Sequence, residues 1–252
     1  MPEPIRVAVA GAAGRMGSTV CDAVEAADGL VLSGRADPAL ETALADVLGD
    51  ADVLVDFTIP DQALGNATAC LEAGVSVVVG TTGFDLDELR AAAERTWSGG
   101  EGPRAFVAPN FAIGAVLMME IGQRVAEHMP EVEIVELHHD RKLDAPSGTA
   151  IATADRIAAA RGAQPWAPDP TEREVLPGAR GARNSGGVPV HAVRMRGMVA
   201  HQDVVFGAEG QSLTVRQDSY DRTSFMPGVL LAVKQVAQHP GVTIGLDALL
   251  NL

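Results

Sequence analysis

The chain has 252 residues, which is long enough for one large or two small domains with a core that needs no disulfides or metals. Against 33 Asp and Glu residues there are 19 Lys and Arg residues, and the net charge of −14 repels phosphate backbones and anionic lipid surfaces. The hydrophobic share of 47% excludes a disordered chain, and no apolar run reaches the roughly 18 residues of a membrane-spanning helix. We therefore expect a globular protein with neither a nucleic-acid partner nor a membrane partner.

The amino-terminal residues lack a basic segment and a long apolar stretch, so they predict a first strand rather than a signal peptide. Cys21 and Cys70 lie in helical patterns far apart in the sequence and imply no disulfide framework. Two isolated thiols suit a reducing compartment, and we expect a cytoplasmic protein.

Short aliphatic runs alternate with helical patterns in the first half of the chain. The predicted strands are Ile5–Ala10, Leu30–Ser33, Val53–Asp56, Val75–Val79 and Ala105–Ala108. The predicted helices are Gly17–Ala27, Asp61–Ala73 and Asp85–Thr96, while Ala39–Leu48 fits either a helix or an irregular connection. This alternation indicates an α/β domain whose parallel sheet is covered on both faces.

The pattern changes near Asn110. The predicted elements beyond it are helices at Phe111–Met129, Ser147–Ala160 and Thr223–Gln238, strands at Glu131–Leu137, Pro189–Arg196, Gln202–Gly207 and Ser212–Gln217, and a long loop over 161–187. The last three strands follow each other closely, which favours antiparallel pairing. We expect an α+β domain here.

A glycine-rich loop follows the first predicted strand and precedes a helix. Its spacing, G-x-x-G-x-x-G, runs from Gly11 through Gly14 to Gly17, one residue longer than the usual dinucleotide fingerprint. Glycines there let a diphosphate approach main-chain N–H groups at a helix N-terminus, although a βα turn packed for its own sake is an alternative.

Arg35 and Asp37 follow the second predicted strand, about 20 residues beyond the loop. A carboxylate at this place binds the hydroxyls of an adenosine ribose, and an arginine accepts a 2′-phosphate. The pair therefore predicts loose discrimination between NADH and NADPH. The alternative for each residue is a solvated surface charge.

Two further motifs stand at the carboxyl ends of predicted strands, where ligands gather in open α/β sheets. One is Gly80-Thr81-Thr82-Gly83, and the other is Ala108-Pro109-Asn110-Phe111. Their small, hydroxyl and amide groups suit a nicotinamide and its ribose, although ordinary turn chemistry also explains them. For Asp56–Pro60, which also ends a strand, we expect turn structure rather than function.

The densest chemistry lies between Glu136 and Ala150. His138, His139, Arg141 and Lys142 form a local cationic cluster in an acidic chain, and histidine titrates near neutral pH as a proton donor must. Just beyond, Ser147-Gly148-Thr149 opens a helix whose free N–H groups can receive a carboxylate. The combination suggests a dianionic small molecule as ligand. A capped helix after a solvated loop, or a metal site on the two histidines, remains open, although the spacing matches no common zinc pattern.

These motifs, in this order and over nearly the whole chain, resemble those of the dihydrodipicolinate reductase family. The specific part is the block that runs from Glu136-Leu137-His138-His139 to Lys142 and on to Ser147-Gly148-Thr149. The resemblance implies NAD(P)H-dependent reduction of 4-hydroxy-tetrahydrodipicolinate to tetrahydrodipicolinate, with loss of water, in the diaminopimelate route to lysine. It implies NADH or NADPH as cofactor and no metal.

The resemblance also implies roles for individual residues. His138 and Lys142 match proton-transferring catalytic residues, and His139, Gly148 and Thr149 match substrate-binding ones. The implied cofactor-binding residues are Gly11, Ala12, Ala13, Gly14, Arg15, Met16, Asp37, Gly80, Thr81, Thr82, Ala108, Pro109, Asn110 and Phe111.

For the architecture, the resemblance implies a Rossmann-like dinucleotide-binding domain of residues 1–109 and 218–252. An inserted α+β domain of residues 110–217 would bind the substrate, a small dicarboxylate, and build a homotetramer. Two other functions remain open: a dinucleotide-sensing module without catalysis, and a metal-dependent hydrolase built on His138 and His139.

Overall fold

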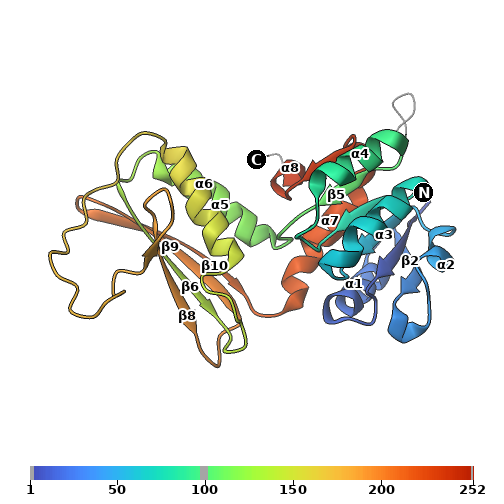
Figure 1. The fold of residues 1–252 in the computed structure, drawn as a ribbon, viewed down its shortest axis with the longest axis horizontal. Helices are drawn as coiled ribbons and strands as arrows, with labels where there is room; N and C mark the ends of the chain where they lie inside the picture. Colours follow the sequence, from blue (N-terminus) through green and yellow to red (C-terminus); the bar gives the residue numbers. More distant parts are fainter. Residues whose placement is uncertain (1–2, 97–101, 251) are drawn as a thin grey trace. The chain divides into compact units, whose positions relative to one another are not determined.

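The computed structural model describes residues 3–96, 102–250 and 252 and divides the chain into two compact units (Figure 1). The first unit consists of residues 1–113 and 222–252, and the second of residues 114–221. The sequence prediction places the two crossings at residues 110 and 218.

A six-stranded parallel sheet forms the first unit, with the strand order β11-β5-β4-β3-β1-β2. Its strands are β1 (Ile5–Ala10), β2 (Leu30–Ala36), β3 (Val53–Asp56), β4 (Ser76–Val79), β5 (Ala105–Val107) and β11 (Val242–Ile244). The helices are α1 (Arg15–Ala26), α2 (Ala45–Leu48), α3 (Pro60–Glu72), α4 (Leu86–Thr96), α7 (Met226–Gln235) and α8 (Asp247–Leu250), with 3₁₀ turns at Pro38–Leu40, Arg222–Phe225 and Val236–Gln238.

Helices cover both faces of this sheet. Alternate strand residues such as Ala8, Leu54 and Val77 pack in one buried cluster with side chains of α2, α3 and α4. The intervening residues, among them Val7 and Val9, are fully buried as well, and α1 and α7 contact each other outside that cluster. The strands are therefore apolar on both faces, as the predicted doubly covered, Rossmann-like sheet requires.

The second unit has a mixed five-stranded sheet in the order β10-β9-β6-β8-β7. Its elements are α5 (Ile113–Ala126, whose first residue lies in the first unit), β6 (Glu131–His138), α6 (Gly148–Arg161), β7 (Ala182–Arg183), β8 (Pro189–Arg194), β9 (Ala200–Ala208) and β10 (Gln211–Ser219). Side chains of α5 and α6 share a buried cluster with Ile134, Val190 and Phe206, so both helices cover one face of the sheet.

The strand pairing differs from the sequence prediction in one respect. β9 and β10 are antiparallel neighbours, but β8 does not pair with β9. Instead β6 lies between them, parallel to β8 and antiparallel to β9. Val132 and Ile134 of β6 face the helices and are buried, and Glu136 is buried in the same row, so the strand fits a central position in this sheet.

Candidate active site

The glycine loop joins β1 to α1 by a tight turn. Gly11 has φ +76°, a left-handed conformation that favours glycine. A Cβ on Gly17 would lie 2.0 Å from the carbonyl oxygen of Gly11, so only glycine lets the first turn of α1 approach the loop this closely. Of the predicted cofactor residues, Gly11 to Gly14 form this turn, and Arg15 and Met16 begin α1. The N-terminus of a 12-residue helix thus stands directly behind the glycine loop, as a diphosphate site requires.

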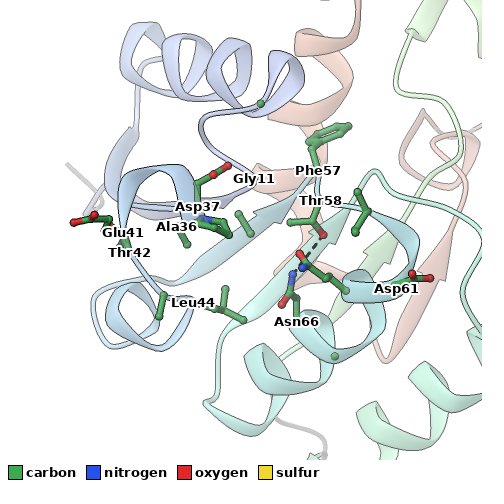
Figure 2. A pocket seen from close by; sticks show the side chains of 17 residues that line it. Gly11, Ala36, Asp37, Glu41, Thr42, Leu44, Phe57, Thr58, Asp61 and Asn66 are labelled. Atoms are coloured by element: carbon green, nitrogen blue, oxygen red, sulfur yellow. Dashed lines mark hydrogen bonds between the residues drawn. The ribbon is translucent and has the colours of Figure 1, made fainter.

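A pocket of about 850 Å³ opens beside this loop (Figure 2). Gly11, Gly14 and Asp37 line it, with residues of the β3–α3 connection on another side. The Asp37 carboxylate accepts hydrogen bonds from the Ala13 N–H at 3.1 Å and from the Ala39 N–H at 2.9 Å. These two bonds hold the acid against the glycine loop, at the place expected for a group that binds ribose hydroxyls.

Arg35 does not contribute to the pocket. Its Nη2 atom lies 2.9 Å from Oε1 of Glu25 on α1. Among the described residues that line the pocket, none is an arginine, lysine or histidine, whereas Asp37, Glu41 and Asp61 are acidic. Arg35 therefore does not line the pocket in this arrangement, and its contact with a 2′-phosphate stays a prediction.

The connection after β3 contributes more to the pocket than the sequence analysis predicts. Buried Asp56 accepts hydrogen bonds from the N–H and the hydroxyl of Thr58 and from the Asn66 amide, as in a structural turn. The turn nevertheless places Phe57, Thr58 and Ile59 in the wall of the pocket. The sequence signal was the position itself, the carboxyl end of a central strand.

The other two predicted cofactor segments lie at the carboxyl ends of the neighbouring strands β4 and β5. Thr81 donates its hydroxyl to the Thr58 carbonyl at 3.1 Å, and the ring centroids of Phe111 and Phe57 are 5.8 Å apart. Both contacts join these segments to the β3 connection. Neither segment lines the 850 Å³ pocket, whose lining residues come from the glycine loop, the β2 and β3 connections and helix α3. The structure therefore brings Gly11, Gly14 and Asp37 together and places Gly80–Thr82 and Ala108–Phe111 farther along the same sheet edge.

In the second unit, His138 ends β6 and contacts a fully buried carboxylate. Its Nδ1 atom hydrogen-bonds Glu136, whose side chain has no exposed surface, while the His138 side chain is 16% exposed. Burial lowers the pKa of His138, and the neighbouring Glu136 carboxylate partly offsets this effect. A carboxylate at Nδ1 leaves Nε2 as the atom that exchanges a proton.

Glu136 also holds the groups around His138. Arg194 of β8 donates to both of its carboxylate oxygens, at 2.8 and 2.7 Å, and the Ser147 N–H donates at 3.0 Å. Arg194 reaches further, to the Asp144 carbonyl, at 2.7 Å. Burial opposes ionisation of Glu136, but these hydrogen bonds outweigh it, so the pKa of the carboxyl is below its usual value. The sequence analysis names neither Glu136 nor Arg194 as a site residue. Arg194 lies 58 residues from Glu136 in the chain, so their contact has no local sequence pattern.

The helix α6 begins with an open anion-receptor geometry. Ser147 caps it, since the serine hydroxyl accepts from the Ala150 N–H at 3.2 Å. Gly148 is exposed, and a Cβ added there would meet no atom within 4 Å. Space therefore lies in front of Gly148, at the N-terminus of a 14-residue helix.

The loop between β6 and α6 carries the other two predicted residues. Lys142 Nζ lies 2.8 Å from Asp144, and its side chain is 22% exposed. The Nδ1 atom of His139 accepts from the Arg141 N–H at 3.2 Å, so the neutral ring carries its proton on Nε2 and can donate to an anion. The structure thus brings His138, Lys142 and the start of α6 together through Glu136, Arg194 and Asp144.

His191 and His201 each contact a carboxylate outside the cluster around His138. His191 contacts Glu133 at 2.6 Å, and His201 contacts Asp218 at 2.6 Å. In residues 3–96, 102–250 and 252 there is no group of three His, Cys, Asp or Glu side chains arranged to hold a metal ion. No described helix is long and apolar enough to cross a membrane.

Comparison with known proteins extends the assignment to the whole chain. The family model described as dihydrodipicolinate reductase, N-terminus, matches residues 5–111, and that described as dihydrodipicolinate reductase, C-terminus, matches residues 114–250. Among curated proteins, the 4-hydroxy-tetrahydrodipicolinate reductase of Corynebacterium efficiens is 51% identical over 251 residues, covering 98% of this chain and 99% of the relative. That of Beutenbergia cavernae is 52% identical over 250 residues with the same coverage.

Solved structures agree. A dipicolinate-bound dihydrodipicolinate reductase from Paenisporosarcina sp. TG-14 is 39% identical, with a TM-score of 0.83 over 97% of this chain and 99% of that one. Myo-inositol 2-dehydrogenase from Lactobacillus plantarum is 14% identical, with a TM-score of 0.61 over 98% and 93% of the two chains, and shows a shared fold alone.

The Rossmann-like sheet, its glycine loop and the histidine–lysine cluster define an NAD(P)H-dependent oxidoreductase, as the sequence predicts. The two family matches cover nearly all of the sequence in the right order. The chain belongs to the dihydrodipicolinate reductase family.

Proposed function

We propose that the protein reduces 4-hydroxy-tetrahydrodipicolinate to tetrahydrodipicolinate, with loss of water, in the diaminopimelate route to lysine. The observation that carries this proposal is the single cluster in which Glu136 joins His138 to the N-terminus of α6, and Arg194 joins Glu136 to Asp144, the ion-pair partner of Lys142. Relatives about 50% identical over nearly their full length are named for this reaction.

The residues of the first unit fit a nicotinamide dinucleotide. The diphosphate would lie on the glycine loop from Gly11 to Met16, where a Cβ on Gly17 would close the turn, and Asp37 would bind a ribose of the adenosine half. Gly80, Thr81 and Thr82, with Ala108, Pro109, Asn110 and Phe111, would hold the nicotinamide half at the ends of β4 and β5. Bound NADH or NADPH supplies the hydride.

The second unit offers the groups that a dicarboxylate requires. Main-chain N–H groups at Gly148 and Thr149 would receive one carboxylate, helped by the positive end of the α6 dipole. His139 would donate from Nε2, because its Nδ1 already accepts from the main chain. A dipicolinate-bound relative at 39% identity supports an aromatic or cyclic dicarboxylate at this site.

The reaction requires proton transfers, for which two side chains are suitably placed. Loss of the hydroxyl as water takes up one proton and releases one from a neighbouring ring carbon, and hydride addition to the ring then needs one further proton. His138, with Nδ1 engaged by Glu136, exchanges its proton at Nε2, and Lys142 Nζ is the second donor. The Asp144 carboxylate lies 2.8 Å from Lys142 Nζ and holds that group in place by an ion pair.

Calorimetric titration with dipicolinate tests this site without turnover. We expect the wild-type chain to bind it and the His139→Ala variant to bind it about tenfold more weakly, the cost of one charge-assisted hydrogen bond. His128→Ala serves as the control, because His128 is exposed and is not one of the proposed site residues. Equal binding by wild type and His139→Ala would contradict the proposed substrate contact.

We also propose that the second unit builds the homotetramer that the family resemblance implies. Val135 and Leu137 of β6, Val193 of β8 and Val205 of β9 lie on the sheet face opposite α5 and α6, where they are only partly buried. An apolar sheet face of this kind gains stability when a second copy covers it. Light scattering should give a mass of four times 26.1 kDa, and a monomer mass would contradict the proposal.

A cytoplasmic location stays a prediction, supported by two free and buried thiols, Cys21 and Cys70. Cell fractionation followed by detection of the chain tests it, and recovery outside the cytoplasmic fraction would contradict it.

A further inference from the structure

Glu136 is an unusual residue for the middle of a protein core. Its side chain has no exposed surface, yet it carries a charge in contact with the His138 ring, the Arg194 guanidinium and the Ser147 N–H. A carboxylate buried in this way costs stability unless each of its oxygens is hydrogen-bonded. Both oxygens are hydrogen-bonded here. The partners His138 and Ser147 belong to the candidate active site, and the partner Arg194 also bonds the loop that carries Lys142.

We infer that Glu136, clamped by Arg194, is a positioning residue for the reaction, which fixes the tautomer of His138 and aligns it with the start of α6. This inference rests on the proposed function of His138. Glu136 is not a catalytic residue, because its buried carboxylate is enclosed by its partners and acts through the ring beside it.

The first step of the argument concerns the imidazole. An ionised carboxylate only accepts hydrogen bonds, so His138 must carry a proton on Nδ1. Nε2 then has its lone pair, or its second proton, free for exchange with the substrate. A partner that donated a hydrogen bond to Nδ1 would select the opposite tautomer and close Nε2 to proton acceptance.

The second step concerns the backbone around the ring. The oxygen of Glu136 that receives the Ser147 N–H also receives Nη2 of Arg194, and the same Nη2 atom bonds the Asp144 carbonyl. One carboxylate thereby connects three segments: the end of β6, the loop that carries Lys142, and the first residues of α6. Arg194 also bonds the Val193 carbonyl at 2.8 Å, which anchors the clamp in β8.

The third step concerns charge. The charged groups that face His138 are Glu136 on its own strand, Lys142 and Asp144 on the following loop, and Arg194 on β8. Burial, Lys142 and Arg194 lower the pKa of His138, and Glu136 alone among its named neighbours raises it. Replacing Glu136 by a neutral group of the same shape should therefore lower that pKa further.

The decisive variant is Glu136→Gln, and the chain offers a matched control. Glu133 lies on the same strand and contacts a histidine and an arginine too, His191 at 2.6 Å and Arg180 at 2.6 Å, but on the opposite face of the sheet. Glu133→Gln therefore removes an equivalent Glu–His–Arg contact set. Because Glu133 lies on the proposed subunit face, the mass of this control should be measured alongside its activity.

We expect Glu136→Gln to lower kcat about 10- to 100-fold and to leave the Kd of NADH unchanged. In the pH dependence of kcat, the limb that reports the titration of His138 should move to lower pH. Glu133→Gln should stay within about twofold of wild type with an unmoved limb. A Glu136→Gln variant that matches the control in kcat and in pH limb would overturn the positioning function.

A double variant separates positioning from stability. Glu136→Gln alone leaves the Arg194 charge uncompensated, whereas Glu136→Gln with Arg194→Met removes both charges. We expect the double variant to regain most of the lost Tm without regaining kcat. Recovery of kcat together with Tm would show that the pair serves stability alone.

The tautomer can be read directly, without turnover. In protein with ¹⁵N-labelled histidine, we expect the His138 resonances to report a proton on Nδ1 in wild type and on Nε2 in Glu136→Gln, with His138→Gln used to assign them. Lack of turnover by wild type would overturn the proposed function. An unchanged His138 tautomer in Glu136→Gln would overturn the positioning function, whatever the wild-type activity.

Discussion

Arg35 and Glu25 form an ion pair, Nη2 to Oε1 at 2.9 Å, that links β2 to helix α1. Arg35 and Asp37 are close in sequence, and either could contact a cofactor. In the fold, however, Arg35 pairs with Glu25 of α1, whereas the Asp37 carboxylate accepts a hydrogen bond from the Ala13 N–H of the glycine loop. The charge that an adenosine ribose would meet in this pocket is negative, from Asp37 and Glu41.

We expect this arrangement to favour NADH over NADPH. A 2′-phosphate beside two carboxylates is repelled, and we expect the Kd of NADPH to exceed that of NADH by about tenfold, or about 1.4 kcal/mol. Asp37→Asn should narrow this ratio, since it removes one of the charges. Asp22→Asn, an exposed carboxylate on α1, makes the same change in net charge and serves as the control. Fluorescence titration with NADH and with NADPH measures the two Kd values, and tighter binding of NADPH by wild type would contradict the predicted preference for NADH.

Lys142→Ala should lower kcat by about 10²- to 10⁴-fold, the usual loss when a positioned proton donor is removed. The cofactor residues lie in the first unit, so the Kd of NADPH should stay nearly unchanged. The other lysine of the chain, Lys234, is exposed on α7, and Lys234→Ala controls for the loss of one positive charge. Steady-state turnover at wild-type rate in Lys142→Ala would remove this residue from the mechanism.

Gly17→Ala should damage both the fold and the cofactor site. The new Cβ would lie 2.0 Å from the Gly11 carbonyl oxygen, so either the loop or α1 must move, at a cost of about 1–3 kcal/mol in the free energy of unfolding. Gly49→Ala is the matched control, because a Cβ there meets nothing within 4 Å and the residue has φ −62°. Thermal unfolding and NADH titration measure the two effects, and equal Tm values in both variants would argue against the close approach.

Acid should weaken the fold through His138 as well as through the carboxylates. Burial holds the pKa of His138 below its usual 6.5, so between that value and the folded pKa the unfolded chain binds more protons than the folded one. The free energy of unfolding must then fall as the pH drops below about 6.5. We expect Tm to decline less between about pH 7.5 and 5.5 in His138→Gln than in wild type. Parallel curves would contradict burial of a neutral imidazole.

Local features of the fold were well predicted from the sequence. β1 and β3 have the predicted bounds, because each is a short, mainly apolar run whose last four residues are buried and which is bounded by turn residues. The serine cap placed the start of α6 correctly, since the Ser147 hydroxyl bonds the N–H three residues on. Periodicity and capping act over a few residues and can be read directly.

Long-range pairing could not be read in this way. The three strands that follow the long loop suggested a simple antiparallel series, but β6, more than 50 residues upstream of β8, inserts beside it. The same register brings Arg194 to Glu136 across 58 residues. The three-residue strand β11 was also missed, because so short a segment has no recognisable period. The sequence contains one signal for the role of Glu136: it is an acidic residue at an inward position of a half-buried strand.

The most direct test of the proposed reaction follows absorbance at 340 nm while the condensation product of pyruvate and aspartate semialdehyde is mixed with the protein and NADH or NADPH. The account predicts oxidation of the cofactor that depends on this substrate and is lost in Lys142→Ala. Cofactor binding without oxidation of either cofactor would contradict it and favour a dinucleotide-sensing module instead.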